Sequence, residues 1–262
     1  SSDPNLQNIP IRTETGREIR SAFLPEEGWT LVAADYSQIE LRVLAHFCQD
    51  PTLRQAFEAD EDIHALVASQ VYEVPLTEVT PEMRRNAKGV NFGVIYGQSS
   101  FGLANQLNIE RDEAEAFIEA YFARYASVDA FLTEILNNCR RDGFVRTISG
   151  RKRSIVGIRP DPPRRQRNLA ERTAINTVIQ GSAADLIKRA MLNLHHRLRD
   201  ESWRSRMLLQ IHDELIFEAP PEEIDALIPL VRAEMSTAES LDVPIKVDVK
   251  TGKTWADTEP YG

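Results

Sequence analysis

The chain is poor in cysteine and in long apolar runs, and each shortage excludes a class of protein. Its 262 residues include two cysteines, Cys48 and Cys139, which lie far apart and form neither a zinc-type pair nor a disulfide framework. No apolar stretch approaches the ~18 residues that a membrane helix requires. The first five residues lack the positive charge and apolar run of a signal peptide. We therefore expect a cytoplasmic protein with no membrane partner.

The common short motifs for nucleotide and zinc chemistry are also missing. The sequence contains no Gly-x-x-x-x-Gly-Lys phosphate loop and no His-Glu-x-x-His zinc helix. It does not begin with methionine, which suggests a processed, cut or partial chain. With 42% hydrophobic residues it is nevertheless long enough to bury one large core or two modest ones.

Basic residues are outnumbered overall but concentrated in one stretch. The net charge is −9, which argues against a nucleic-acid partner. Residues 140–172, however, hold eleven Lys or Arg against three acids, a local net charge of +8. This stretch is either a solvated charged face or a track for phosphate groups. Its cations are Arg140, Arg141, Arg146, Arg151, Lys152, Arg153, Arg159, Arg164, Arg165, Arg167 and Arg172.

Hydrophobic patterning predicts strands near both ends and helices between them. Apolar runs predict a strand at 30–35, a hairpin of 207–211 with 215–218, and a last strand at 244–249. Residues 145–148 predict a short strand followed by a turn at Gly150. Helical patterns cover 39–47, 62–73, 80–96, 111–141, 165–200 and 222–240, with a stop at Asp50-Pro51 and a possible break near Gly181. The expected fold is α+β, with a sheet assembled from both ends and a helical insertion.

Two aspartates lie where predicted strands end. Asp35 follows the apolar run of 30–34, and Asp213 lies in the turn between the two hairpin strands. Two carboxylates from distant segments can hold a pair of magnesium ions for phosphoryl transfer. An Asp at a strand end is more often a turn or cap residue, and spacing alone does not bring these two together.

A four-residue repeat marks the helix predicted at 80–96. Arg84, Lys88, Phe92 and Tyr96 recur on one helical face, basic at the start and aromatic at the end. That order suits a nucleoside triphosphate, with cations for the phosphates and rings for the base or sugar. The alternative is an ordinary amphipathic helix. Three glycines in the segment, at 89, 93 and 97, favour a place where a ligand approaches or the helix moves.

Five segments together resemble the motifs of family A DNA polymerases, the bacterial polymerase I-like family. Residues 35–42, Asp-Tyr-Ser-Gln-Ile-Glu-Leu-Arg, resemble the first palm motif. Residues 84–97 resemble the fingers motif, and 210–214, Gln-Ile-His-Asp-Glu, resemble the second palm motif. Residues 2–10 and 180–185 match two further blocks. The blocks occur in the family's order and cover nearly the whole chain.

The resemblance implies roles for the matching residues. It makes Asp35, Asp213 and the backbone of Tyr36 ligands of two Mg²⁺ ions, with Glu214 in support. It also assigns Lys88 as candidate general acid and Glu40 as the residue that excludes ribonucleotides. The residues that it places around the deoxynucleoside triphosphate are Tyr36, Gln38, Glu40, His64, Arg84, Lys88, Phe92 and Tyr96. It assigns primer–template contacts to Asn5, Asn8, Arg172, Asn176, Gln180 and His212.

The same resemblance predicts a division into palm and fingers. Residues 1–60 and 166–262 are expected to form a palm with an antiparallel sheet, and 61–165 mostly helical fingers. The family's thumb and exonuclease-like domain are expected to be absent from this sequence. Gly89 and Ser182 replace residues that are usually Thr in the family. The expected partners are primer–template DNA and deoxynucleoside triphosphates, and the expected state is a monomer.

Three functions remain open on the sequence. The first is a DNA-templated DNA polymerase that works in replication or repair. The second is a two-metal nuclease, which would not need the triphosphate stripe. The third is a non-catalytic or weakly active nucleic-acid-binding fragment, which loss of either aspartate would favour.

Overall fold

The computed structural model describes residues 6–10, 13–158 and 164–261. The chain divides into two compact units. The sheet unit comprises residues 1–39, 186–240 and 245–262, and the helical unit comprises residues 40–185 and 241–244. Each unit is described by itself.

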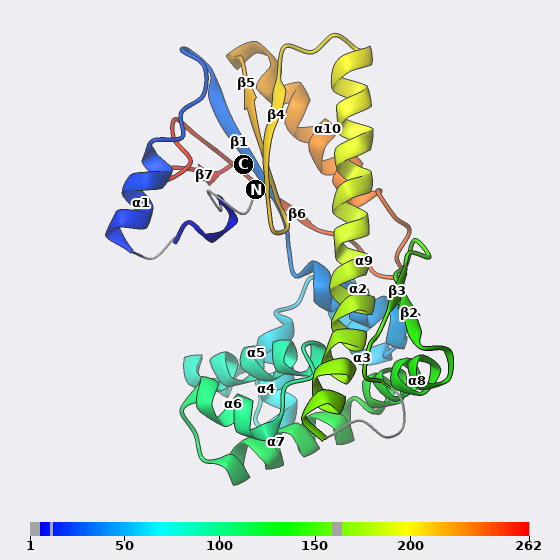
Figure 1. Ribbon diagram of the computed structural model, residues 1–262. Helices are drawn as coiled ribbons and strands as arrows, with labels where there is room; N and C mark the ends of the chain where they lie inside the picture. Colours follow the sequence, from blue (N-terminus) through cyan, green and yellow to red (C-terminus); the bar gives the residue numbers. More distant parts are fainter. Residues whose placement is uncertain (1–5, 11–12, 159–163, 262) are drawn as a thin grey trace. The chain divides into compact units, whose positions relative to one another are not determined.

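The sheet unit is built on five antiparallel strands in the order β4-β5-β1-β6-β7 (Figure 1). The central strand β1 (Thr30–Tyr36) comes from the N-terminal part of the chain. Its neighbours come from the C-terminal part: β4 (Arg206–Ile211), β5 (Glu214–Ala219), β6 (Val247–Gly252) and β7 (Glu259–Pro260). The sheet therefore joins segments about 180 residues apart in sequence, as Thr30 opposite Ala219 illustrates.

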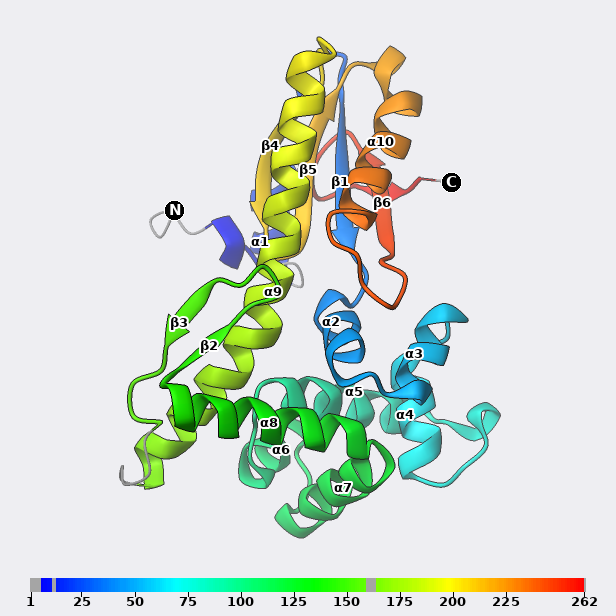
Figure 2. The same cartoon turned by 90° about the vertical axis from the view of Figure 1, so that its right-hand side faces the viewer.

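The two faces of this sheet have different coverings. Helix α10 (Ile224–Ser236) and the C-terminal part of α9 (Arg164–Asp200) lie over one face (Figures 1 and 2). The buried Tyr36 points to that side, and its hydroxyl donates to the Met235 carbonyl at 2.7 Å. Helix α1 (Glu14–Ser21) lies on the opposite side of the sheet. Because side chains alternate along a strand, Asp35 faces away from α10.

The helical unit consists mainly of short helices. Helix α5 packs against α4 and α6, and α7 packs against α4, α6 and α8. A small hairpin, β2–β3, follows α8. The elements are α2 (Ile39–Cys48), α3 (Pro51–Glu58), α4 (Ile63–Val71), α5 (Pro81–Ile95), α6 (Ser100–Leu107), α7 (Arg111–Arg124), α8 (Ala126–Asp142), β2 (Phe144–Arg146) and β3 (Lys152–Ser154). Short 3₁₀ turns occupy Leu6–Asn8, Leu76–Glu78 and Pro221–Glu223.

The predicted α+β fold is confirmed, and most predicted elements are present. The strand at 30–35, the hairpin, and the helices at 39–47, 62–73, 80–96 and 111–141 all occur, the last as two helices. Both cysteines are free and buried. Among the residues that the structure describes, no helix has the length and apolar character needed to cross a membrane.

Several details of the prediction were wrong. Helix α9 continues through Gly181 without a break. A Cβ at Gly181 would lie 2.8 Å from Thr147 Cγ2, so this glycine serves close packing. Asp50-Pro51 ends one helix but also begins the next, because the Asp50 carboxylate accepts from two backbone amides at the start of α3.

Other errors concern element ends and short elements. Helix α10 stops at Ser236 rather than residue 240, and β6 begins at Val247 rather than residue 244. The prediction also missed α1, α3, α6, β3 and β7. Helix α1 buries only Gly16 and Arg20, and so gives almost no apolar periodicity.

Candidate active site

The turn between β4 and β5 carries the first of the predicted catalytic aspartates. Ile211 pairs with Glu214, so His212 and Asp213 alone form the connection. His212 has φ +54°, a left-handed conformation that is uncommon for a residue with a side chain. The backbone N–H of Tyr36 donates to the Asp213 carbonyl at 3.2 Å. The turn is therefore joined directly to the end of β1.

Three carboxylates lie side by side across three strands at this point. Asp35 on β1 is paired with Glu214 on β5 and with Asp248 on β6. Directly opposed residues on adjacent strands have Cβ atoms about 4.5–5.5 Å apart and share a face. We call Glu214, Asp35 and Asp248 the acid row. The charge of Asp213 acts on the carboxyl group of Asp35, and both residues line one cleft, so the two predicted metal ligands lie close together.

The environment of Asp35 opposes its ionisation. Loss of water around the carboxyl group, followed by the charges of Asp213, Glu214 and Asp248, raises its pKa from 3.8 to about 7. The side chain keeps an exposed surface, because it lies in an open cleft. Burial is also the main factor that raises the pKa of Asp213 and of Glu214. This site holds more negative charge than its surroundings stabilise.

A cleft of about 630 Å³ in the sheet unit contains these groups. Asp35, Asp213 and Glu214 line it together with Arg20 and Trp255. The Arg20 guanidinium lies 3.7 Å from the centre of the Trp255 ring. Arg20 also donates to the Ile9 carbonyl at 3.3 Å. Burial raises the pKa of Glu214, and both Arg20 and Trp255 oppose that rise, so they favour the ionised form of Glu214 in the cleft.

The donor set fits magnesium that completes its coordination with substrate and water. Within the described ranges, no group of three or more His, Cys, Asp or Glu side chains has the arrangement of a protein-only metal site. Magnesium is commonly held by one or two carboxylates, with phosphates and water as the other ligands. Asp35 and Asp213 match that pattern, because burial raises the pKa of each and the charge of Asp213 raises that of Asp35 further.

We expect the metal-free protein to lose stability as pH rises through the pKa of Asp35. The folded-state pKa of about 7 exceeds the ordinary value of 3.8, so the folded protein binds this proton more tightly than the unfolded chain. The contribution of this proton to the free energy of unfolding is complete below about pH 4 and is lost as pH rises through 7. Asp35→Asn lacks this titration. In EDTA at about pH 8, its melting temperature should exceed the parent's by a few degrees.

Magnesium supplies the control for this prediction. At about pH 8, added Mg²⁺ should raise the melting temperature of the parent and leave Asp35→Asn nearly unchanged. Equal melting curves for the two proteins at about pH 5 and pH 8 would contradict the assigned repulsion.

The four-residue stripe is present on α5 in the helical unit. Lys88 Nζ lies 6.0 Å from the centre of the Phe92 ring, and the Phe92 and Tyr96 rings stack with centroids 6.0 Å apart. Arg84 and Lys88 are exposed, whereas Phe92 and Tyr96 are half-buried. Arg84 Nε donates to Asp62 Oδ2 at 2.6 Å. The basic end is thus accessible to an anion and the aromatic end is supported by packing.

His64 lies beside this stripe as a neutral side chain. Its ring centroid is 5.9 Å from that of Phe92, and its Nδ1 lies 2.9 Å from Asn91 Nδ2. Burial is the main cause that lowers its pKa to about 4, and Lys88 and Arg84 lower it further against the opposing charge of Asp62. When the Asn91 amide donates to Nδ1, the ring proton lies on Nε2 and is available to a phosphate oxygen.

The glycines of α5 serve helix packing. A Cβ at Gly89 would lie 2.7 Å from Leu107 Cδ2 on α6, and one at Gly93 would lie 3.0 Å from Gln98 Oε1. Because these two glycines have no side chain, the α6 segment can approach α5 closely. Close packing of α5 against the α6 segment therefore explains Gly89 and Gly93, in place of the expected approach of a ligand.

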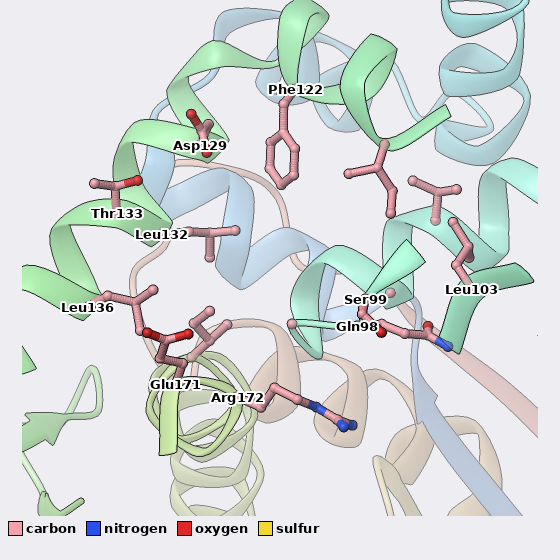
Figure 3. Close-up of a pocket in the computed structure, with 15 residues that line it drawn as sticks. Gln98, Ser99, Leu103, Phe122, Asp129, Leu132, Thr133, Leu136, Glu171 and Arg172 are labelled. Atoms are coloured by element: carbon pink, nitrogen blue, oxygen red, sulfur yellow. The ribbon is translucent and has the colours of Figure 1, made fainter. Parts of the chain in front are cut away.

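A cavity of about 390 Å³ lies on the side of α5 that carries Gly93 (Figure 3). Leu103, Phe122, Leu132 and Leu136 give it an apolar lining, and Glu171 and Arg172 lie at one side. Arg172 Nε donates to the Tyr96 carbonyl at 3.2 Å. The predicted DNA-contact residue Arg172 is thus connected to the aromatic end of the stripe.

The other predicted site residues are distributed over both units. Gln38, with φ +53°, is half-buried after β1, and Glu40 is half-buried in the first turn of α2. Asn176 and Gln180 lie one helical turn apart on α9, half-buried and exposed respectively. Asn8 is exposed, and Asn5 lies outside the described residues.

Many cations of the 140–172 stretch are engaged within the helical unit. Arg140 pairs with Glu171 at 2.5 Å and Arg151 with the buried Asp185 at 2.5 Å. Arg153 donates to Thr177 Oγ1 at 3.0 Å. Arg159 and the side chains of Arg164, Arg165 and Arg167 lie outside the described residues. The described part is a mixed network rather than an uninterrupted phosphate track.

Among the cleft residues that were not expected from the sequence are Arg20, Lys250 and Trp255, and Asp248, which pairs with Asp35, was not expected either. Only Asp248 and Lys250 carried a signal, because they alternate with Val247 and Val249 as one face of a strand does. The predicted strand ended at residue 249 and missed their relation to Asp35.

Comparison with known proteins gives a consistent result over the whole chain. The sequence profile described as DNA polymerase family A matches residues 1–257. DNA polymerase I of Geobacillus stearothermophilus is 52% identical over 263 residues, covering 99% of this chain and 30% of the relative. DNA polymerase I of Pseudomonas aeruginosa is 47% identical over 255 residues, covering 97% of this chain and 28% of the relative. The chain thus spans about 30% of such relatives.

One solved structure shares the fold closely. It is the POL domain of Pol1 from M. smegmatis, in complex with DNA primer-template and dNTP. The match has a TM-score of 0.92 and 48% identity, and covers 98% of this chain and 45% of the other.

Proposed function

This chain belongs to DNA polymerase family A, and from that premise we propose that it adds deoxynucleotides to a primer 3′-hydroxyl under the direction of a DNA template. The reaction would be phosphoryl transfer with release of pyrophosphate. Replication and repair are the proposed settings, and residues 61–165 the proposed fingers.

The observation that carries the proposal is the meeting of Asp35 and Asp213. They lie 178 positions apart in the sequence, yet both line one cleft at the point where the end of β1 meets the β4–β5 turn. Burial raises the pKa of both, and the charges of Asp213, Glu214 and Asp248 raise that of Asp35 further. Such a site is suited to cations that arrive with the substrate.

Asp35, Asp213 and the backbone of Tyr36 are the proposed holders of two Mg²⁺ ions. Bound there, the ions would supply positive charge to the attacking 3′-oxygen and to the leaving pyrophosphate. Tyr36 can contribute only its backbone, because its side chain is buried against α10. Glu214, which lines the same cleft, would support the site without being a principal ligand.

The α5 stripe is the proposed site for the triphosphate. Arg84 would exchange Asp62 for the phosphates, and the exchange requires little energy because exposed ion pairs contribute only about 0–1 kcal/mol. Lys88 would bind the same phosphates and donate a proton to pyrophosphate. His64 and Gln38 would line the pocket, with Phe92 at the sugar and base and Tyr96 on the template side.

Primer–template contacts are proposed for residues from several elements. Arg172 and Asn176 on α9 would contact the duplex near the growing end, as would Gln180. His212 would do so from the turn beside Asp213. Asn5 and Asn8 would contact its backbone.

A primer-extension assay tests the proposal. A labelled primer is annealed to four templates that differ only in the next base, and is incubated with Mg²⁺ and single deoxynucleotides at low salt. Extension only by the complementary nucleotide is expected. Shortening of the primer would instead indicate a nuclease, and DNA binding without extension would indicate a weakly active or non-catalytic fragment.

Glu40→Ala should admit ribonucleotides. We propose that the Glu40 side chain occupies the space of a 2′-hydroxyl, so its truncation removes a repulsive contact with the wrong substrate. The ratio of kcat/KM for deoxy over ribo substrates should fall by roughly a hundredfold. Single-nucleotide incorporation kinetics with matched dNTP and rNTP measure this ratio, and an unchanged ratio would remove Glu40 from the role.

A further inference from the structure

Lys250 places a positive charge on the same face of the sheet as the acid row. It lies two residues after Asp248 on β6, so the two side chains point to the same side. Lys250 is paired with Ala33, and therefore lies diagonally across the β1–β6 pair from Asp35. Diagonal neighbours have Cα atoms about 7–8 Å apart, within reach of a long side chain.

The cleft brings Lys250 and the metal-site carboxylates into one cavity. Lys250 lines it together with Asp35, Asp213 and Glu214. Burial raises the pKa of both Asp35 and Glu214, and the charge of Lys250 opposes this rise at each of them. Its charge therefore acts on two members of the acid row, Asp35 and Glu214.

Lys250 remains accessible. Its residue is exposed, and among the described residues it makes no ion pair at contact distance. The other cation that acts on Glu214, Arg20, is buried against Trp255. Lys250 is thus an exposed positive charge in the lining of the same cleft.

We propose that Lys250 is a positioning residue that sets the divalent-ion concentration at which the Asp35–Asp213 site fills. Its charge lowers the negative potential of the acid row, so that filling requires more free ion. The inference rests on the proposed metal site. A lysine charge about 8 Å from a divalent ion in a solvated cleft should lower the affinity for that ion roughly three- to tenfold.

Mn²⁺ binding to the DNA-free and nucleotide-free protein tests the inference. Free Mn²⁺ is measured by electron paramagnetic resonance at low salt and about pH 8, one unit above the pKa of about 7 for Asp35. Lys250→Gln should lower the half-filling concentration roughly three- to tenfold, and Lys250→Glu should lower it further. Lys250→Arg should match the parent within about twofold, and the effect should shrink at high salt.

Two controls separate the inference from its premise. Asp35→Asn should abolish Mn²⁺ binding, and binding retained in that variant would overturn the proposed metal site itself. Lys253→Gln removes an exposed charge three residues further along and should leave the midpoint within about twofold of the parent.

The inference on Lys250 is overturned by any of three results in a protein whose Asp35→Asn control behaves as expected. The first is an unchanged half-filling concentration in Lys250→Gln. The second is an equal shift of that concentration in Lys253→Gln. The third is a shift in Lys250→Arg as large as that in Lys250→Gln. An unchanged midpoint together with weaker DNA binding would assign Lys250 to a phosphate of the primer strand instead.

Discussion

Asp35→Ala and Asp213→Ala should each reduce nucleotide incorporation by at least about a thousandfold. Each substitution removes a carboxylate from the point where the β4–β5 turn meets the end of β1. The remaining carboxylate would have to hold two divalent ions alone, so the charge that develops during phosphoryl transfer would lose its stabilisation. Single-turnover primer extension at saturating Mg²⁺ measures the loss.

The fold should survive these substitutions, because each relieves repulsion between carboxylates. Circular dichroism melting in EDTA checks this expectation. Asp257→Asn is a matched control, since Asp257 lines the same cleft but accepts from Thr254 Oγ1 at 2.9 Å. It should retain activity within about threefold. Activity within tenfold of the parent in Asp35→Ala or Asp213→Ala, with a normal melting curve, would contradict the two-carboxylate assignment.

Lys88→Ala should reduce the incorporation rate by about 10²–10⁴-fold, the range of general acid catalysis. Lys88 is exposed one turn before Phe92, where it would meet the phosphates of a nucleotide bound along α5. Its loss removes both a phosphate contact and the proposed proton donor to pyrophosphate. Pre-steady-state kinetics distinguish these roles, because a contact alone mainly raises the apparent dissociation constant of the nucleotide.

Two variants of α5 complete this test. Lys88→Arg keeps the charge but donates a proton poorly, since the guanidinium pKa exceeds about 12. We expect Lys88→Arg to restore nucleotide binding more fully than the incorporation rate. Arg85→Ala removes a neighbouring exposed cation that pairs with Glu82 at 3.3 Å and lies outside the stripe. A loss in Arg85→Ala equal to that in Lys88→Ala would indicate a general charge effect.

Local sequence signals predicted the elements that carry the site. The apolar run before Asp35 and the two runs around Asp213 predicted β1 and the β4–β5 hairpin, because period-two patterns and a polar turn are local properties. The four-residue repeat predicted the stripe on α5, which the contacts of Phe92 with Lys88 and Tyr96 confirm. Short or weakly apolar helices such as α1 and α6 escaped prediction because their periodicity is slight.

Tertiary structure alone decided which of these residues meet. Asp35 and Asp213 are adjacent because β1 and β5 pair in one register, and a shift of one residue would point Asp35 to the α10 side. The same register places Asp248 opposite Asp35 and Lys250 diagonal to it. By itself, the sequence determined the elements, the motifs and their residue types. The charge balance of the cleft arises between strands that are distant in sequence, so only the folded sheet determined it.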